Sequence, residues 1–335
     1  MTDTDTGKIT AAVVGLGRIA SLLEDDPLRE KPCTHAGALE ANPQCALAAG
    51  ADADESRRRL FAERWGVPVY ADAEGMIQAH KPHILVVATH PDSHQRYCAL
   101  AAALKVPAVV CEKPLAGTLG QARKIAGLHR RRAVTIITNH ERRYSQDYLR
   151  AKALLGGERL GRLLSARASL FMGASRRLLD VFWHDATHIV DALMFLSGGR
   201  AKHSKAWGAP LTAREGSAFL LGRLDRPAGA VPFTLELGAG RDHLVFELEF
   251  SCEHGRLRIG NGVFAVWESG PCPYAQGFRS LTPTGETFAG PTGYFAAMIQ
   301  DAALCALDRA REPCSSALDG LYTIEYLHSV KSWGR

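Results

Sequence analysis

Short apolar runs alternate with helix-patterned stretches through the first half of the chain, and this alternation restricts the possible folds most. The runs read "KITAAVVG", "CALAAGAD", "HILVVAT", "AVVCEKP" and "AVTIIT", and stretches such as "DESRRRLFAERWG" separate them. Nearly every residue of a run is apolar, which is typical of strands buried on both faces of a parallel sheet. The succession predicts an α/β domain of the Rossmann type, a doubly wound parallel sheet with right-handed crossovers.

The sequence changes character near residue 160, where longer strands joined by glycine-rich turns begin. "FELEF" alternates apolar and charged residues, so one face of its sheet meets a core and the other meets water or a partner. We therefore expect a dinucleotide-binding domain over residues 1–141 and a substrate-binding α+β domain over residues 142–335, with a large open, mainly antiparallel sheet. Helices are expected near residues 181–197, 293–309 and 316–331, and the last of them can pack back on the first domain.

Composition restricts the partners and the location of the protein. No run of the 335 residues approaches the roughly 18 apolar residues of a membrane span, and the polar start "MTDTDTGK" is unlike a signal peptide. We expect a cytoplasmic protein with no membrane partner. The eight cysteines form no C-x-x-C pair and are expected to be reduced. The net charge of +5 comes from scattered basic clusters without interleaved aromatics, which argues against a nucleic-acid partner and favours anionic cofactor phosphates.

A glycine-rich turn follows the first predicted strand. Gly15, Gly17 and Ala20 fit the pattern G-x-G-x-x-G/A, with Arg18 and Ile19 between them. The first glycine permits a tight turn, the second lets the backbone approach a pyrophosphate, and the small third residue packs helix against strand. The alternative is a plain glycine-rich turn, but its place after the first strand of a parallel sheet favours binding of NAD or NADP through these residues.

Asp52 ends the second predicted strand, where an acidic residue binds the ribose hydroxyls and favours NAD. Arg57 and Arg58 follow closely and suit the 2'-phosphate of NADP. The sequence leaves this choice of cofactor open.

The stretch "EDDPLREKPC" interrupts the helix that should follow the glycine turn. Asp52 comes 35 positions after Gly17, whereas the fingerprint expects an acidic residue after about 20. Each proline disfavours helix in the residue before it, so residues 22–34 are expected to form an irregular loop beside the pyrophosphate. Either this loop contacts cofactor or substrate, foremost through Arg29 and Lys31, or it is a surface insertion without a role. In both cases it is expected to contribute little to stability.

Lys113 stands at the end of a buried strand in "VVCEKPLAGTL", with Glu112 before it and a proline after it. This position lies at the edge of the sheet where ligands bind. The pattern indicates either a cation directed at a ligand or a salt-bridged lysine at a strand end.

The stretches "GLGRIA", "ATHPDSHQRYCALAAALKVPAVVCEKPLA", "NHERRY", "LLGGERLGRLLSARA" and "PCSSALDGLYTIEYLHSV" together resemble the Gfo/Idh/MocA family of NAD(P)-dependent oxidoreductases. The resemblance extends over nearly the whole chain. It implies the two domains described above, and a homodimer or homotetramer formed through the second domain's sheet.

The resemblance also implies roles for several residues of the first domain. It places Lys113, with Glu112, between nicotinamide and substrate, and allows a cis bond between Lys113 and Pro114. Three residues of the loop after the fourth strand line the cofactor, although the second replaces the family's usual proline: Thr89, His90 and His94. Arg143 and Tyr144 match the Arg-aromatic pair that opens the second domain and contacts substrate. His35 stands where the family has its own histidine.

A second catalytic region reads D-x-G-x-H-x-x-D in the family and "VFWHDATHIVDALMFL" here. His188 and Asp191 match the histidine and the second aspartate. His184 replaces the first aspartate, Ala186 replaces the glycine, and Asp185 comes one residue late. On a regular helix His184, His188 and Asp191 would share a face, and Asp185 would lie one turn before His188. Either Asp185 or His184 could orient His188.

The expected chemistry is hydride transfer between nicotinamide and a secondary alcohol or ketone of a sugar, cyclitol or similar small metabolite. His188 suits proton transfer near neutral pH, with Asp185 or His184 beside it, and Lys113 favours a developing alkoxide. Alternatives are a core role for His188, a non-catalytic NAD(P)-sensing regulator, or reduction of an imine or conjugated ring. No metal site is expected, because only Asp191 adds a third ligand to the H-x-x-x-H spacing.

Overall fold

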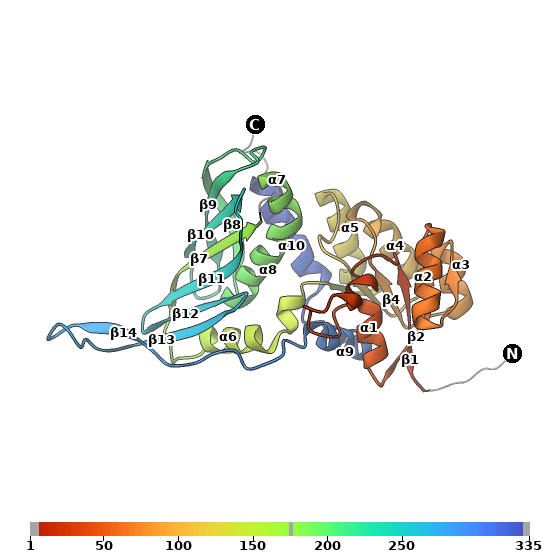
Figure 1. The fold of residues 1–335 in the computed structure, drawn as a ribbon, viewed down its shortest axis with the longest axis horizontal. Coiled ribbons are helices and arrows are strands. Elements are labelled where there is room, and N and C mark those ends of the chain that lie inside the picture. Colours follow the sequence, from red (N-terminus) through yellow and green to blue (C-terminus); the bar gives the residue numbers. More distant parts are fainter. Residues whose placement is uncertain (1–6, 174–176, 331–335) are drawn as a thin grey trace. The chain divides into compact units, whose positions relative to one another are not determined.

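The computed structural model describes residues 7–173 and 177–330, and the chain divides into two compact units (Figure 1). Unit 1 comprises residues 1–144 and 291–321, and unit 2 comprises residues 145–290 and 322–335. The division expected at residue 141 therefore differs from the structure mainly in the segment 291–321, which returns to unit 1. Apolar side chains of this segment, such as Phe295, Met298 and Ile299, are buried in the hydrophobic core of unit 1.

Unit 1 contains a six-stranded parallel sheet in the order β3-β2-β1-β4-β5-β6. The strands are β1 (Ile9–Val14), β2 (Cys45–Ala51), β3 (Val69–Tyr70), β4 (Ile84–Val87), β5 (Ala108–Cys111) and β6 (Thr135–Thr138). The helices are α1 (His35–Ala41), α2 (Glu55–Trp65), α3 (Ala73–His80), α4 (Pro91–Ala103), α5 (Leu119–Arg130) and α9 (Tyr294–Leu307), with short 3-10 turns η1 (Leu22–Asp25) and η2 (Glu141–Tyr144). The predicted doubly wound parallel sheet is confirmed. The apolar runs are buried on both faces, as β4, β5 and β6 have no exposed residue.

Parallel strands bring their carboxyl ends to one edge of the sheet. In unit 1 this edge carries Gly15 after β1, Asp52 after β2, Thr89 after β4, Glu112 after β5 and Asn139 after β6. Polar groups from distant parts of the sequence therefore meet there.

Unit 2 contains an eight-stranded sheet in the order β14-β13-β12-β11-β7-β10-β9-β8. The strands are β7 (Leu163–Met172), β8 (Arg200–Gly208), β9 (Gly216–Asp225), β10 (Val231–Ala239), β11 (Leu244–Cys252), β12 (Gly255–Gly260), β13 (Val263–Pro271) and β14 (Arg279–Pro283). Neighbouring strands are antiparallel except β7 and β10, which run parallel. The expected open, mainly antiparallel sheet is confirmed.

The helices of unit 2 are α6 (Gln146–Gly156), α7 (Leu178–Asp180), a π-helical turn η3 (Val181–Asp185) and α8 (Ala186–Ser197). The helix α10 (Ala317–Val330) continues from unit 1 into unit 2 after Leu321. Helix α8 is buried along nearly its whole length and contacts β7, β8 and β11. Within the described ranges, no helix combines the length and the apolar character needed to cross a membrane.

Candidate functional site

The turn after β1 requires glycine at its first position. Gly15 has φ of +87°, in the left-handed region that favours glycine, and a Cβ there would lie 2.7 Å from the Ala88 carbonyl oxygen. The Gly15 N–H donates to the Ala51 carbonyl at 2.8 Å. The absence of a side chain thus lets the ends of β1, β2 and β4 converge.

Gly17 leaves the next part of the turn open. The nearest atom to a Cβ built there is Arg57 Nη1, at 4.0 Å. Among the residues that the structure describes, the N–H groups of Gly17, Arg18 and Ile19 donate to no protein acceptor. Three free N–H groups beside an open glycine suit an anion such as a pyrophosphate, so this turn fits a dinucleotide.

Asp52 is fixed beside this turn by backbone donors. Its Oδ2 accepts from the Leu16 N–H at 2.8 Å and its Oδ1 from the Asp54 N–H at 2.9 Å. The Arg57 guanidinium lies 3.7 Å from Oδ2 and its side chain is half exposed. Arg58 donates instead to the carbonyl oxygens of Asp52 and Ala53. Arg57 is therefore the better placed of the two arginines for a phosphate on the ribose.

Glu112 lies in a buried polar cluster before Lys113. Its Oε1 accepts from Asn139 Nδ2 at 2.5 Å and lies 2.8 Å from His35 Nε2. Burial raises the pKa of Glu112, but hydrogen bonds from His35 and Asn139 and the charges of His35 and Lys113 outweigh it and lower the pKa overall. The carboxylate also accepts from the Lys113 N–H at 3.2 Å. The Lys113–Pro114 bond is cis, as the resemblance allowed.

Two members of this cluster had no role in the sequence interpretation. Asn139 follows β6, the strand next to β5, and polar residues after adjacent parallel strands are a signal that could have indicated it. His35 begins α1, directly after the insertion, and is fully buried with Phe295 edge-on against its ring.

Residues 22–34 form the expected loop, with one 3-10 turn at Leu22–Asp25. Lys31 Nζ donates to the carbonyls of Leu23 and Asp26 and to Cys33 Sγ, so its three donors are used inside the loop. Arg29 pairs with Asp26 at 3.2 Å. The structure therefore does not support Lys31 as a phosphate ligand, because its ammonium group closes the loop instead.

Two carboxylates stabilise the loop, Glu24 by bonds within it and Glu30 by bonds to the start of α9. Glu24 Oε2 accepts from Thr34 Oγ1 at 2.6 Å and from the Cys33 N–H at 3.2 Å. Glu30 accepts from the N–H groups of Thr292 and Gly293, at 2.7 and 2.8 Å, at the start of α9. Burial raises the pKa of Glu30, but these bonds outweigh it and lower the pKa.

The loop after β4 contains the three residues expected to line the cofactor. Thr89 Oγ1 lies 2.6 Å from Ser93 Oγ, and His90 is the exposed N-cap residue of α4. His94 is fully buried, with Nε2 3.0 Å from the Thr89 carbonyl and Nδ1 3.3 Å from the Leu115 carbonyl. Burial lowers the pKa of His94, so its ring is neutral at physiological pH. A neutral ring has a single N–H, so His94 donates to one of these two carbonyls and lies against the other.

Arg143 and Tyr144 are both buried in unit 1. Arg143 contacts Asp319 at 3.1 Å and donates to the Cys314 carbonyl, and Tyr144 donates to Asp301 at 3.0 Å. Burial, with the nearby Asp301, raises the pKa of Tyr144 well above its usual value. Both side chains thus tie η2 to the segment 301–319, and their contact with substrate stays a prediction.

Unit 2 carries the histidine region, where the helix expected near residues 181–197 is found as a π turn followed by α8. Residues Val181–Asp185 form a π turn in which the Ala186 N–H donates to the Val181 carbonyl, five residues back. A π turn holds one residue more than an α turn, and such turns often occur at functional sites. His184 is exposed, whereas Asp185 and Asp191 are buried and His188 is half-buried. The π turn departs from the regular helix assumed for His184, His188 and Asp191, and their common face stays a prediction.

Within residues 7–173 and 177–330, no group of three or more His, Cys, Asp or Glu side chains is arranged to hold a metal ion.

Comparison with known proteins agrees with the geometry of unit 1. Residues 9–140 match a family described as "Oxidoreductase family, NAD-binding Rossmann fold". The matching family model is that of the Gfo/Idh/MocA family, and the match is confined to this part of unit 1. The matched segment contains the glycine turn, Asp52, the loop after β4 and Lys113.

Relatives of known name match only part of the chain. Inositol 2-dehydrogenase 2 of Saccharopolyspora erythraea is 33% identical over 120 residues, 35% of this chain and 35% of that protein. D-Apiose dehydrogenase of Paraburkholderia graminis is 33% identical over 94 residues, 28% of this chain and 25% of that protein. The chain thus spans about a third or less of the length of these relatives.

The fold as a whole has solved counterparts. An oxidoreductase from Agrobacterium radiobacter, solved with NAD+, L-tartaric acid and magnesium, has a TM-score of 0.75 and 18% identity. The similarity covers 98% of this chain and 96% of that one. At this identity the likeness establishes the two-domain fold.

Proposed function

We propose that the protein is an NAD(P)-dependent oxidoreductase that interconverts a secondary alcohol and a ketone on a sugar, cyclitol or related polar metabolite. The observation that carries the proposal is the turn at Gly17, with three free N–H groups beside a fixed Asp52 carboxylate. It lies at the same edge of the sheet as Lys113. The relatives named as inositol and apiose dehydrogenases support the substrate class.

The dinucleotide is held, in this proposal, by the backbone of Gly15, Gly17, Arg18, Ile19 and Ala20. Asp52 accepts hydrogen bonds from the adenosine ribose, because each carboxylate oxygen retains a lone pair beyond its backbone donor. Arg57 adds a positive charge beside it, which allows NADP as well as NAD. The bound nicotinamide supplies the hydride acceptor or donor.

The protein's own groups handle the oxygen and its proton. His188 takes the hydroxyl proton as the carbonyl forms and returns it in the reverse reaction. Lys113 donates a hydrogen bond to the same oxygen and stabilises negative charge on it. Glu112 restrains the backbone at Lys113 by accepting its N–H, and the charge of Lys113 helps to lower the pKa of the Glu112 carboxyl. Asp185 is proposed to orient His188, since it is buried while His184 is exposed.

The open face of the unit 2 sheet is proposed to form a homo-oligomer contact. It carries Trp207 stacked on Phe219, with ring centroids 5.3 Å apart, and Leu164 on β7, which is about half exposed. Apolar side chains in this number on a sheet face favour association.

A substrate panel tests the proposal. Polyols, cyclitols, sugars and keto-sugars are offered with NAD+, NADP+, NADH and NADPH, and nicotinamide absorbance is followed. We expect turnover with at least one member and its loss in K113M and H188A, with cofactor binding retained in H188A. Tight cofactor binding without turnover across the panel would contradict catalysis and favour a nucleotide-sensing regulator.

A further inference from the structure

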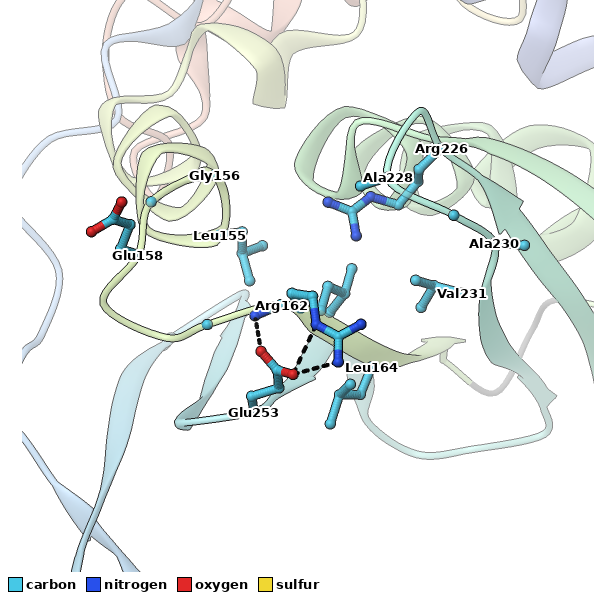
Figure 2. A pocket seen from close by; sticks show the side chains of 14 residues that line it. Leu155, Gly156, Glu158, Arg162, Leu164, Arg226, Ala228, Ala230, Val231 and Glu253 are labelled. Carbon is cyan, nitrogen blue, oxygen red and sulfur yellow. Dashed lines mark hydrogen bonds and ion pairs between the residues drawn. The ribbon is translucent and has the colours of Figure 1, made fainter.

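A pocket of about 660 Å³ lies within unit 2, and its lining contains none of the residues proposed above for cofactor binding or catalysis (Figure 2). It is formed where α6 ends, where β7 and β10 begin, and by the turns between β9 and β10 and between β11 and β12. We call it the Arg226 pocket. Its apolar walls are Leu155, Leu163, Leu164, Ala228, Ala230 and Val231. Its size is typical of pockets for small molecules.

Four charged residues line the pocket, and two of them, Arg162 and Glu253, pair with each other. Arg162 donates to Glu253 through Nε at 2.8 Å and through a second guanidinium nitrogen, so this pair is neutral overall. Figure 2 shows the Glu158 carboxylate directed away from the apolar walls. Among the described residues, no hydrogen bond or ion pair joins the Arg226 guanidinium to another side chain, and Figure 2 shows it directed into the pocket between Leu155 and Val231.

The turn that carries Arg226 leaves room for its side chain. The Gly229 N–H donates to the Arg226 carbonyl at 3.1 Å, closing a tight turn with Pro227 at its second position. A Cβ on Gly199 would lie 2.6 Å from Arg226 Cγ, so the arginine stem passes over a residue without a side chain. The stem thus reaches the pocket without displacing a neighbouring side chain.

From these observations we propose that the Arg226 pocket binds a small monocarboxylate with an apolar tail. The guanidinium would receive the carboxylate through two parallel hydrogen bonds, and the leucine, valine and alanine walls would bury the tail. The carbonyl end of α6 also faces the pocket at Leu155 and Gly156. Its negative partial charge disfavours a doubly charged phosphate, so a single negative charge fits better.

Calorimetric titration of the full-length protein with three probes of equal chain length tests the charge requirement. The probes are octanoate, 1-octanol and octylammonium. We expect octanoate to bind at least tenfold more tightly than either of the others. Wild-type protein that binds none of them, or binds 1-octanol as tightly as octanoate, would overturn the proposal.

Variants test the residues. R226A should weaken octanoate binding about ten- to a hundredfold, the range for a lost hydrogen-bonded ion pair, and leave 1-octanol unchanged. R226E should reverse the preference towards octylammonium. A228W, at an exposed position of the wall, should block all three probes. R223A is the matched control, because Arg223 pairs with Asp225 and lies outside the lining. Wild-type octanoate affinity in R226A or in A228W, with unchanged thermal unfolding, would refute the site.

Discussion

His35 Nε2 and Glu112 Oε1 lie 2.8 Å apart in the interior of unit 1, although 77 positions separate them in the sequence. This contact joins the first residue after the insertion to the residue before Lys113. Glu24, inside the insertion, bonds to Thr34, which is the N-cap of α1 and immediately precedes His35. The insertion is thus linked by hydrogen bonds to the region of the proposed catalytic lysine.

Replacing His35 with alanine should leave the Glu112 carboxylate buried with one partner fewer. We expect the free energy of unfolding to fall by about 1–3 kcal/mol, measured by urea denaturation. We also expect kcat to fall more than cofactor affinity, since Lys113 loses its fixed neighbour while the glycine turn is untouched. H328A, on an exposed surface of α10, is the control for removing an imidazole. Wild-type kcat in a folded H35A would show that the contact has no influence on Lys113.

The two glycines of the cofactor turn should respond differently to substitution. G17V should keep the fold, because the nearest atom to a Cβ lies at 4.0 Å, but should abolish binding of NADH and NADPH by filling the space beside the free N–H groups. G15A should destabilise unit 1, because its Cβ would lie 2.7 Å from the Ala88 oxygen at φ of +87°. Fluorescence titration and thermal unfolding separate the two effects. Normal cofactor affinity in G17V would remove the basis for the dinucleotide site.

The apolar patterns of the sequence predicted much of this architecture. They did not predict which side chains form hydrogen bonds with one another. The apolar runs predicted the parallel strands, and the place of Gly15, Asp52 and Glu112 after them follows from topology alone. The packing of α9 in the core of unit 1 could not be predicted from the sequence. The apolar residues of a helix predict that it is buried, but not in which domain's core it is buried. The π turn before α8 also leaves no periodic signal, since five residues are too few to show one.

The insertion illustrates the same limit. Its prolines predicted an irregular loop, but the expectation that it adds little to stability conflicts with the bonds of Glu24, Glu30 and Lys31. We now expect that shortening residues 23–32 to a tight turn lowers the free energy of unfolding by at least about 2 kcal/mol, since several bonds to charged groups are lost. E30Q, which weakens only the contact with α9, should cost about 1 kcal/mol. Urea denaturation of both variants measures this, and a shortened protein as stable as wild type would contradict it.

His94 should make unit 1 less stable in mild acid. Burial lowers its pKa below the value of about 6.5 in the unfolded chain, although the charge of Glu112 and the carbonyls of Thr89 and Leu115 oppose this. Between the two pKa values this histidine is protonated in the unfolded chain and neutral in the folded chain, which favours unfolding. His94 therefore leaves the free energy of unfolding unchanged above about pH 6.5 and lowers it as the pH falls towards the folded pKa. Thermal unfolding at pH 7.5 and 5.5 should differ less in H94Q than in wild type. Burial also lowers the pKa of His203, but this residue is present in both wild type and H94Q and so does not affect their difference. H90Q, at an exposed histidine, is the control. An equal difference in H94Q and wild type would exclude this role.

Asp185 and His184 compete for the position of the family's first aspartate, and their burial separates them. Asp185 is 8% exposed at the junction of the π turn and α8, whereas His184 is exposed. A carboxylate shielded from water orients a neighbouring imidazole more strongly than an exposed side chain does. D185N should therefore reduce kcat about a hundredfold with little change in KM, because His188 loses the carboxylate proposed to orient it. H184N should change kcat less than threefold. Assays on the best substrate of the panel decide between them, and the reverse result, with H184N inactive and D185N near wild type, would assign the role to His184.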